Sequence, residues 1–302
     1  MLLHPRGIVL ASDAASFLDE ALPADLSRAN AVVSVVMAGA RADRLGFAFA
    51  AGYVAALAAL LGRHGASPSH LRRACVAATE MGGGHPRAIA TSLTPDGDGY
   101  RLDGEKSWVT LGRDAELAIV IAKVGEANGR PLLRAVALPT NREGVAFEDT
   151  PAPPFAPEIS HAKLVLRAVR VDEAELLAGD GYADWLKPFR TIEDIHVHAA
   201  LVGYLGGAWG RAGAGSRVAA ELVAVAGVLV DLAARDENAA STHVALDGAL
   251  GLVRDLGERH ASCWGGVSQA EKARWERDRA LLDVAGRARA ERFSRAIERL
   301  SG

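Results

Sequence analysis

The sequence has 302 residues, of which 50% are hydrophobic and 24% charged, and its formal net charge is −3. At roughly 150 residues per domain, this length predicts two or three folded units. The composition excludes an intrinsically disordered chain, which would combine low hydrophobicity with high net charge. The 34 basic and 37 acidic side chains nearly cancel and only 5% of residues are aromatic. Nucleic acid and an anionic membrane are therefore not expected partners.

The first segment, residues 1–73, has a helical texture, with candidate helix starts at Asp13 and Ser16 or at Asp25 and Ser27. Between Arg44 and Arg63 it carries no charge over nearly the 20 residues that span a bilayer. This stretch is dominated by Ala and Gly, whose transfer into lipid is weakly favourable. The pattern favours a helix buried on all sides within a helical domain over a membrane span.

Residues 74–178 change to a strand pattern. Asp-Gly pairs at Asp96-Gly97, Asp98-Gly99 and Asp103-Gly104 supply the positive-φ positions of tight turns, and they predict strand, turn, strand, turn, strand. Further short β-rich runs come after these, each bounded by Gly, Pro or Asn. The segment therefore predicts an antiparallel sheet or small barrel.

Residues 179–302 return to apolar spacings of three and four residues, which predict helices over 195–212, 216–235, 243–260 and 273–300. Four helices with short links predict an antiparallel bundle. The order of helices, β-domain and helix bundle excludes Rossmann and TIM-barrel folds, in which strands and helices alternate. The distant cysteines, Cys75 and Cys263, and the absence of a secretory pattern at the start predict a cytoplasmic protein without disulfides or structural zinc.

A glycine cluster, Thr79 to Pro86, lies between two predicted strands. It lacks the Gly-Lys-Ser/Thr ending of a P-loop and is not GxGxxG. Its backbone N–H groups could still approach a phosphate or a flavin carbonyl, because glycine has no Cβ. The alternative is a purely structural turn.

A second motif, Glu105 to Gly112, places Trp108 and Thr110 on one side of a strand. The indole could form a wall against a flat aromatic cofactor, and the hydroxyl could donate a hydrogen bond to a ring nitrogen. A surface Trp-Thr pair is the alternative.

Together these motifs, T-E-x-x-x-G followed by DGDGYxLxGEKxWxTxGxxAxLAIVxA, strongly resemble the acyl-CoA dehydrogenase family, over most of residues 74–212. The resemblance implies a helical domain, a β-barrel and a four-helix bundle, with FAD as the cofactor and an acyl-CoA or similar thioester as substrate. It implies that these residues lie along or flank the flavin: Ala77, Ala78, Thr79, Gly84, His85, Trp108, Val109 and Thr110. His85 stands where the family usually has a serine. No Arg-x-x-Phe-Gly segment comes after the first bundle helix.

The resemblance also implies a glutamate that removes the α-proton of the thioester, usually just before a glycine that precedes the last helix. Here Ala285 stands beside Gly286 and offers no base. A minority of the family uses a glutamate on the first bundle helix, which corresponds to Glu193 or, one turn away, to His196. The alternative is that Glu193 and Asp194 are a solvated pair near a helix start.

Glu193 and His196 form a single ExxH, whereas a di-iron bundle needs two copies, so no metal site is predicted. Of His196 and His198, we expect one to be exposed and the other hydrogen-bonded. The arginines of the last helix are expected on a solvated or subunit-facing surface.

The sequence supports two functions. One is a flavin-dependent oxidoreductase acting on an acyl thioester or related small carbonyl compound, as a homo-oligomer, with Glu193 as the base; an oxidase or monooxygenase on the same fold would need no such base. The other is a non-catalytic homologue that serves as a binding or partner subunit, paired with a full-length paralogue.

Overall fold

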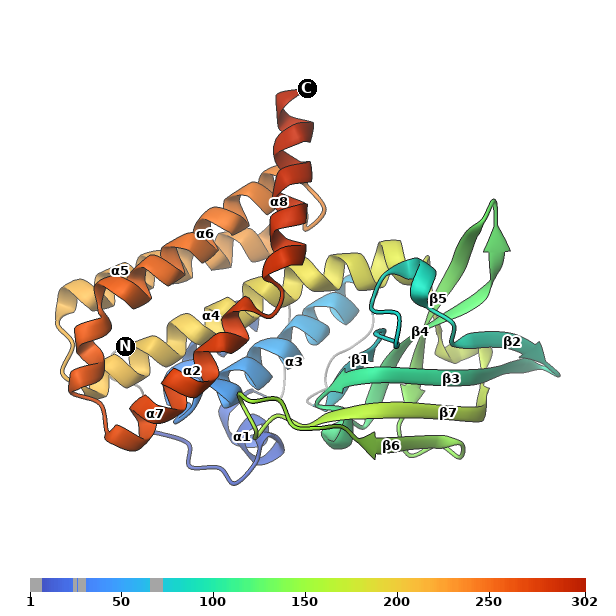
Figure 1. Ribbon diagram of the computed structural model, residues 1–302, viewed down its shortest axis with the longest axis horizontal. Helices are drawn as coiled ribbons and strands as arrows, with labels where there is room; N and C mark the ends of the chain where they lie inside the picture. Colours follow the sequence, from blue (N-terminus) through green and yellow to red (C-terminus); the bar gives the residue numbers. More distant parts are fainter. Residues whose placement is uncertain (1–6, 24–25, 27–30, 66–72) are drawn as a thin grey trace. The chain divides into compact units, whose positions relative to one another are not determined.

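The computed structural model describes residues 7–23, 26, 31–65 and 73–302, which form two compact units. The helical unit comprises 1–62, 153–158 and 191–302, and the β unit comprises 63–152 and 159–190. The chain thus runs from helices through a sheet to further helices, which confirms the predicted fold class (Figure 1). The boundaries of the three predicted domains stay a prediction.

The helices lie mainly in the helical unit: α1 (Ala14–Ala21), α2 (Ala31–Arg41), α3 (Leu45–Arg63), α4 (Lys187–Arg211), α5 (Ser216–Ala234), α6 (Ala240–Arg259), α7 (Gln269–Asp278) and α8 (Gly286–Ser301). Helix α1 begins as predicted, since Asp13 accepts a hydrogen bond from the Ser16 amide at 2.8 Å. The alternative start at Asp25 and Ser27 lies outside the described residues. The single helix predicted over 273–300 is wrong, because a 3₁₀ segment, Arg279–Asp283, separates α7 from α8.

Helix α3 has the length and mean hydropathy, 2.0, of a membrane span, but 89% of its apolar stretch is buried within the protein. Almost every position from Leu45 to Leu61 is buried. The prediction of a helix buried on all sides is therefore confirmed, and its Ala and Gly content lets neighbouring helices pack closely around it.

Helices α2 and α4 approach each other at glycines. A Cβ on Gly203 would lie 2.0 Å from the Val36 carbonyl oxygen, and one on Gly39 would lie 1.9 Å from that of Ala200. Ala at either position would therefore push the helix backbones apart.

We expect Gly203→Ala to destabilise the helical unit, although Ala favours a helix by about 1 kcal/mol over Gly. The matched change, Gly227→Ala in α5, meets no atom within 4 Å and should stabilise it. Urea denaturation checks both signs; stabilisation by Gly203→Ala would contradict the close helix packing.

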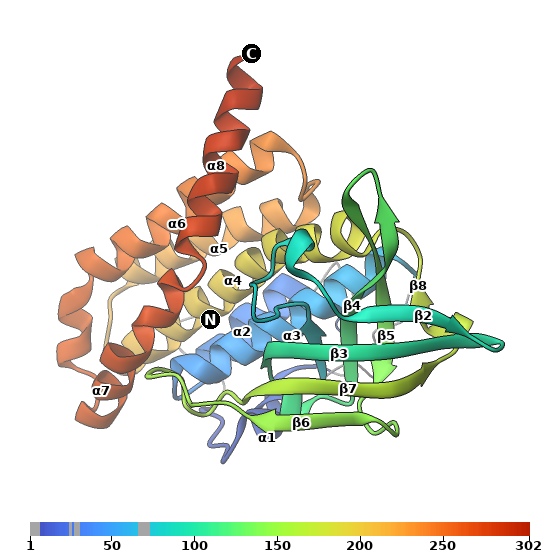
Figure 2. The same cartoon turned by 45° about the vertical axis from the view of Figure 1, so that its right-hand side comes forward.

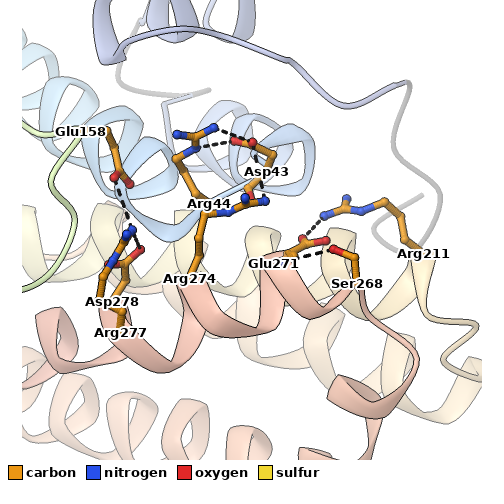
Figure 3. Close-up of polar contacts among 9 residues, drawn as sticks. All are labelled: Asp43, Arg44, Glu158, Arg211, Ser268, Glu271, Arg274, Arg277 and Asp278. Carbon is orange, nitrogen blue, oxygen red and sulfur yellow. Dashed lines mark hydrogen bonds and ion pairs between the residues drawn. The ribbon is translucent and has the colours of Figure 1, made fainter.

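Helix α7 is attached to the rest of the helical unit by charged side chains (Figure 3). Ser268 caps its start by accepting a hydrogen bond from the Glu271 amide, and Arg274 donates to the Asp43 carbonyl at 3.2 Å. At its other end the fully buried Asp278 accepts from the Ala156 amide at 2.7 Å. These bonds fix both ends of a helix that has few apolar residues.

The β unit is one eight-stranded sheet: β1 (Ala74–Ala77), β2 (Ser92–Asp96), β3 (Gly99–Thr110), β4 (Leu117–Ala127), β5 (Arg130–Pro139), β6 (Val145–Asp149), β7 (His161–Val171) and β8 (Leu176–Leu177). The strand order is β6-β7-β3-β2-β4-β5-β8, with β1 also paired to β4 (Figure 2). Most neighbours are antiparallel as predicted, but β4 pairs in parallel with both β1 and β2. Alternate residues such as Leu102, Val120 and Leu164 form its core.

The Asp-Gly turns were predicted partly correctly. Gly97, with φ of +64°, closes the hairpin between β2 and β3. The turn predicted at Asp103-Gly104 is wrong, because this pair lies inside β3 at a register shift. A Cβ on Gly104 would lie 2.7 Å from the Thr91 Cα, so glycine is needed there for a close approach between strands.

Candidate functional site

Trp108 and Thr79 meet in the β unit. They form an isolated antiparallel bridge, and the Ser107 amide donates to the Thr79 carbonyl at 2.9 Å. The pairing of β3 with β7 shifts register between Lys106 and Val109, so a bulge lies at Trp108. Bulges redirect side chains. The structure therefore brings together the two motifs on which the resemblance rests.

The indole of Trp108 is held in place but remains accessible. Its ring stacks on the His161 imidazole with centroids 4.4 Å apart, while 38% of the residue is exposed. Thr110 lies opposite His161 in the register and is half-buried, whereas Val109 between them is fully buried. The predicted placement of Trp108 and Thr110 on one side of the strand agrees with this alternation.

The glycine cluster forms a tight turn. Glu80 and Gly83 exchange two backbone hydrogen bonds, and Gly83 has a φ of +95°, which glycine adopts without strain. The Gly84 carbonyl accepts from Arg190 at 2.8 Å. His85 is exposed, and its Nδ1 accepts from the Arg87 amide at 3.2 Å, which begins a short 3₁₀ turn. Ala77 and Ala78, just before the turn, are buried.

The turn is held to the sheet by a buried ion pair. The Lys106 Nζ lies 2.7 Å from Glu80 Oε1 and also donates to the Ile121 carbonyl at 2.6 Å. Glu80 accepts three further hydrogen bonds, from the Ala90 and Thr91 amides and the Thr91 hydroxyl. Lys106 is fully buried and Glu80 is 8% exposed. The position of the turn is therefore set by one carboxylate with four donors.

Burial shifts the proton affinities of this pair. It lowers the pKa of Lys106 to about 8, against the opposing attraction of Glu80. Burial would raise the pKa of Glu80, but the hydrogen bond and charge of Lys106 and the Ala90 and Thr91 donors together hold it below its ordinary value. The pair is thus ionised at neutral pH.

Sequence reasoning missed three residues of this site: Glu80, Lys106 and His161. Glu80 and Lys106 lie inside the two family motifs. The available signal was Lys106, a charged residue within the alternating pattern of a strand. His161 begins β7 and carried no local signal. Its Nδ1 is buried without a hydrogen-bond partner in the described part of the chain, and burial lowers its pKa to about 4.

Glu193 lies in the helical unit, on α4, and is half-buried. The neighbouring Asp194 is not solvated as the Glu-Asp alternative supposed: it is 5% exposed and forms ion pairs with Arg289 and Arg292 of α8. These two arginines therefore stabilise the unit internally, which corrects the expectation for them, whereas Arg287 and Arg295 of the same helix are exposed as expected. Within the described residues, no group of three or more His, Cys, Asp or Glu is arranged to hold a metal.

His196 and His198 are both buried, at 3% and 4% exposure, so the expectation that one is exposed is wrong. Each Nδ1 hydrogen-bonds the carbonyl four residues earlier, of Ile192 and Asp194, at 2.8 and 2.7 Å. These bonds give the Nδ1 atom of each buried imidazole a partner on its own helix.

Burial lowers the pKa of His198 to about 4, despite the opposing charge of Asp194. In the unfolded chain the ring has a pKa near 6.5, so as the pH falls it takes up a proton before the folded chain does. The neutral buried ring of His198 therefore contributes fully to stability above pH 6.5, and this contribution is lost towards pH 4. We expect the free energy of unfolding to fall over this range by about 3 kcal/mol more than in His198→Gln. Urea denaturation at several pH values checks this; equal pH dependence would contradict it.

The fold and the residues above define an α and β protein whose sheet is inserted into a helical unit. Comparison with known proteins agrees with the sequence motifs. Residues 75–169 match the family model described as acyl-CoA dehydrogenase, middle domain. A probable acyl-CoA dehydrogenase, YngJ of Bacillus subtilis (strain 168), is 30% identical over 130 residues, which are 42% of this chain. The matched stretch spans only 33%, about a third, of that relative.

Solved structures share the fold over nearly the whole chain. Butyryl-CoA dehydrogenase from Megasphaera elsdenii has a TM-score of 0.70 at 17% identity, covering 88% of this chain and 81% of its own. The FAD complex of PigA has a TM-score of 0.70 at 14% identity, covering 96% and 90%. The chain therefore shares the fold of acyl-CoA dehydrogenases, and residues 75–169 are similar in sequence to the middle domain of that family, which confirms the resemblance found in the sequence.

Proposed function

We propose that this protein is an FAD-dependent oxidoreductase that acts on an acyl thioester, or a related small carbonyl compound, as a homo-oligomer. The observation that carries the proposal is Trp108, an indole fixed by a strand bulge and by stacking on His161, yet 38% exposed. A large aromatic side chain left accessible in this way suits a flat ring system. The similarity of residues 75–169 to the middle domain of acyl-CoA dehydrogenases supports the choice of flavin.

The residues present fit a flavin. Thr110 offers a hydroxyl beside Trp108, and the turn up to Gly84 and His85 offers backbone groups with no side chain at Gly82 to Gly84. Ala77, Ala78 and Val109 have buried side chains, so they would contribute only backbone N–H and C=O groups. The Glu80–Lys106 pair would keep this surface fixed. When bound, the flavin would accept a hydride from the substrate.

Glu193 is the proposed base. A carboxylate can accept the α-proton of a thioester, and Glu193 is half-buried on α4. Asp194, the adjacent carboxylate, is already engaged by two arginines and cannot easily take this role.

The proposal is tested by the visible absorption of the purified chain and by Trp108→Ala. We expect a yellow protein with bound FAD, and a loss of about tenfold or more in FAD affinity in the variant, because ring contacts of this kind contribute about 1 kcal/mol or more. Leu132→Ala, which changes another exposed side chain of the β unit, is the control. Light scattering of the same sample gives the number of copies.

A colourless protein that ignores added FAD would overturn the proposal. A protein that binds FAD but oxidises no acyl-CoA would instead favour the alternative of a binding or partner subunit, for which Ala285 beside Gly286 is the supporting observation.

A further inference from the structure

A pocket of about 1030 Å³ opens in the helical unit, lined by α4, α6 and the segment from Ala261 to Ala290. Its volume is at the upper end of the roughly 300 to 1,000 Å³ found for ligand pockets. None of the candidate flavin residues, and not Glu193, lines it. The pocket is therefore distinct from the candidate flavin site, and a ligand for it is inferred independently of the proposed function.

One part of the pocket wall is apolar and aromatic. Trp264 and Trp275 stack with ring centroids 4.8 Å apart, and Leu201, Leu205 and Leu250 line the pocket beside them. Trp264 is 6% exposed, whereas Trp275 is only half-buried. Rigid aromatic and branched side chains of this kind favour a flat apolar ligand, because contact removes their surface from water.

His198 places a polar ring beside this apolar part of the lining. It is 4% exposed and lines the pocket, and its Nδ1 lies 2.7 Å from the Asp194 carbonyl. A carbonyl oxygen can only accept, so Nδ1 carries the proton and Nε2 of the neutral ring is an acceptor. Among the described residues no donor is bonded to Nε2. Nε2 is not among the buried side-chain atoms that lack a partner, so it is accessible from the pocket, where a ligand O–H or N–H group could donate a hydrogen bond to it.

The tautomer is fixed by the contacts that hold Asp194 in place. Asp194 is held by Arg289 and Arg292, and Arg289 also donates to the Leu282 carbonyl at 2.6 Å. The Asp194 carbonyl, which accepts the hydrogen bond from Nδ1 of His198, is therefore kept in place. Burial keeps the His198 ring neutral by lowering its pKa. Nε2 is an acceptor at neutral pH without any rearrangement.

The charges around the pocket cancel. Its lining contains four acidic and four basic side chains: Asp247, Glu258, Glu276 and Asp283, and Arg254, Lys272, Arg279 and Arg289. A pocket without a net charge has no field that selects an anion or a cation. The ligand that fits is therefore uncharged.

We propose that this pocket binds an uncharged aromatic compound that carries one hydroxyl or N–H donor, with the ring against the Trp264 and Trp275 wall and the donor bonded to Nε2 of His198. The site is a binding site, and no chemical change of the ligand is involved.

Titration calorimetry of the full chain with 2-naphthol and with 2-methoxynaphthalene tests the proposal, because the two share a ring system and only the first has a donor. We expect 2-naphthol to bind about tenfold more tightly, since only its hydroxyl group can donate a hydrogen bond to Nε2. In His198→Leu the two compounds should bind with equal affinity. His243→Leu, on α6 outside this pocket, is the matched control and should keep the difference.

Ala290→Trp provides a second variant that does not depend on His198. Ala290 lines the pocket and is exposed, so the indole should fill the space and weaken both compounds by about tenfold or more. The proposal is overturned if the wild-type chain binds neither compound, if it binds both equally, or if Ala290→Trp changes neither affinity. If His198→Leu does not fold, the compound pair and Ala290→Trp still decide the question.

Discussion

Glu193→Gln is expected to reduce the turnover of an oxidised acyl-CoA by about a thousandfold while the FAD content stays unchanged. The amide has the same size and sits at the same half-buried position on α4, but it cannot take up the α-proton. General-base catalysis typically contributes about 10²- to 10⁴-fold. Steady-state rates with butyryl-CoA and octanoyl-CoA and an artificial electron acceptor, together with the absorbance of bound FAD, provide the measurement.

The matched control is Glu298→Gln, which changes an exposed glutamate of α8 and should keep full turnover. Unchanged turnover in Glu193→Gln would rule out Glu193 as the base. Because the resemblance places the base either at Glu193 or one helical turn away at His196, His196 would then be the next residue to replace. A wild-type chain that binds FAD but has no turnover would leave both residues without a catalytic role.

Lys106→Met is expected to lower the free energy of unfolding of the β unit by about 4 kcal/mol. Removing one partner of a buried ion pair typically costs about 3 to 5 kcal/mol, because the remaining charge stays buried. Here the Glu80 carboxylate, 8% exposed, would keep only its three neutral donors from Ala90 and Thr91. Urea denaturation followed by tryptophan fluorescence measures the loss.

Two further variants separate the buried charge from the loss of a lysine in general. Lys163→Met removes a more exposed lysine of β7 that pairs with Glu105 and Glu148, and surface pairs contribute about 0 to 1 kcal/mol. Adding Glu80→Gln to Lys106→Met removes the unpaired charge and should restore part of the stability. Equal losses in Lys106→Met and Lys163→Met would show that burial of the pair does not matter.

Local patterns were sufficient for much of the fold. The spacing of apolar residues, the Asp96-Gly97 turn and the uncharged stretch of α3 each depend on neighbouring residues, and each was found from the sequence. The order of the segments then limited the fold class. The family motifs selected the residues around Trp108, and the roles of those residues toward FAD stay a prediction.

The features that were missed depend on contacts between distant segments. Gly104 was predicted to lie in a turn because it comes directly after Asp103. The structure shows instead that a glycine is needed there because Thr91 of a neighbouring segment approaches closely. Lys106 received no prediction from the sequence, because its partner Glu80, whose Oε1 lies 2.7 Å from the Lys106 Nζ, comes from a distant segment. His196 and His198 are buried together because Gly52 and the helices around α4 pack closely, which no spacing within α4 indicates.

The insertion of the β unit into the helical unit has a consequence for synthesis on the ribosome. Helix α3 emerges early, but Val197 and the rest of α4, which pack against its Gly52, emerge only after the whole β unit has been made. Chains grow at about 5 to 20 residues per second, so the face of this helix at Gly52 stays uncovered for several seconds. During that interval the nascent chain is a natural substrate for chaperones that bind exposed hydrophobic segments.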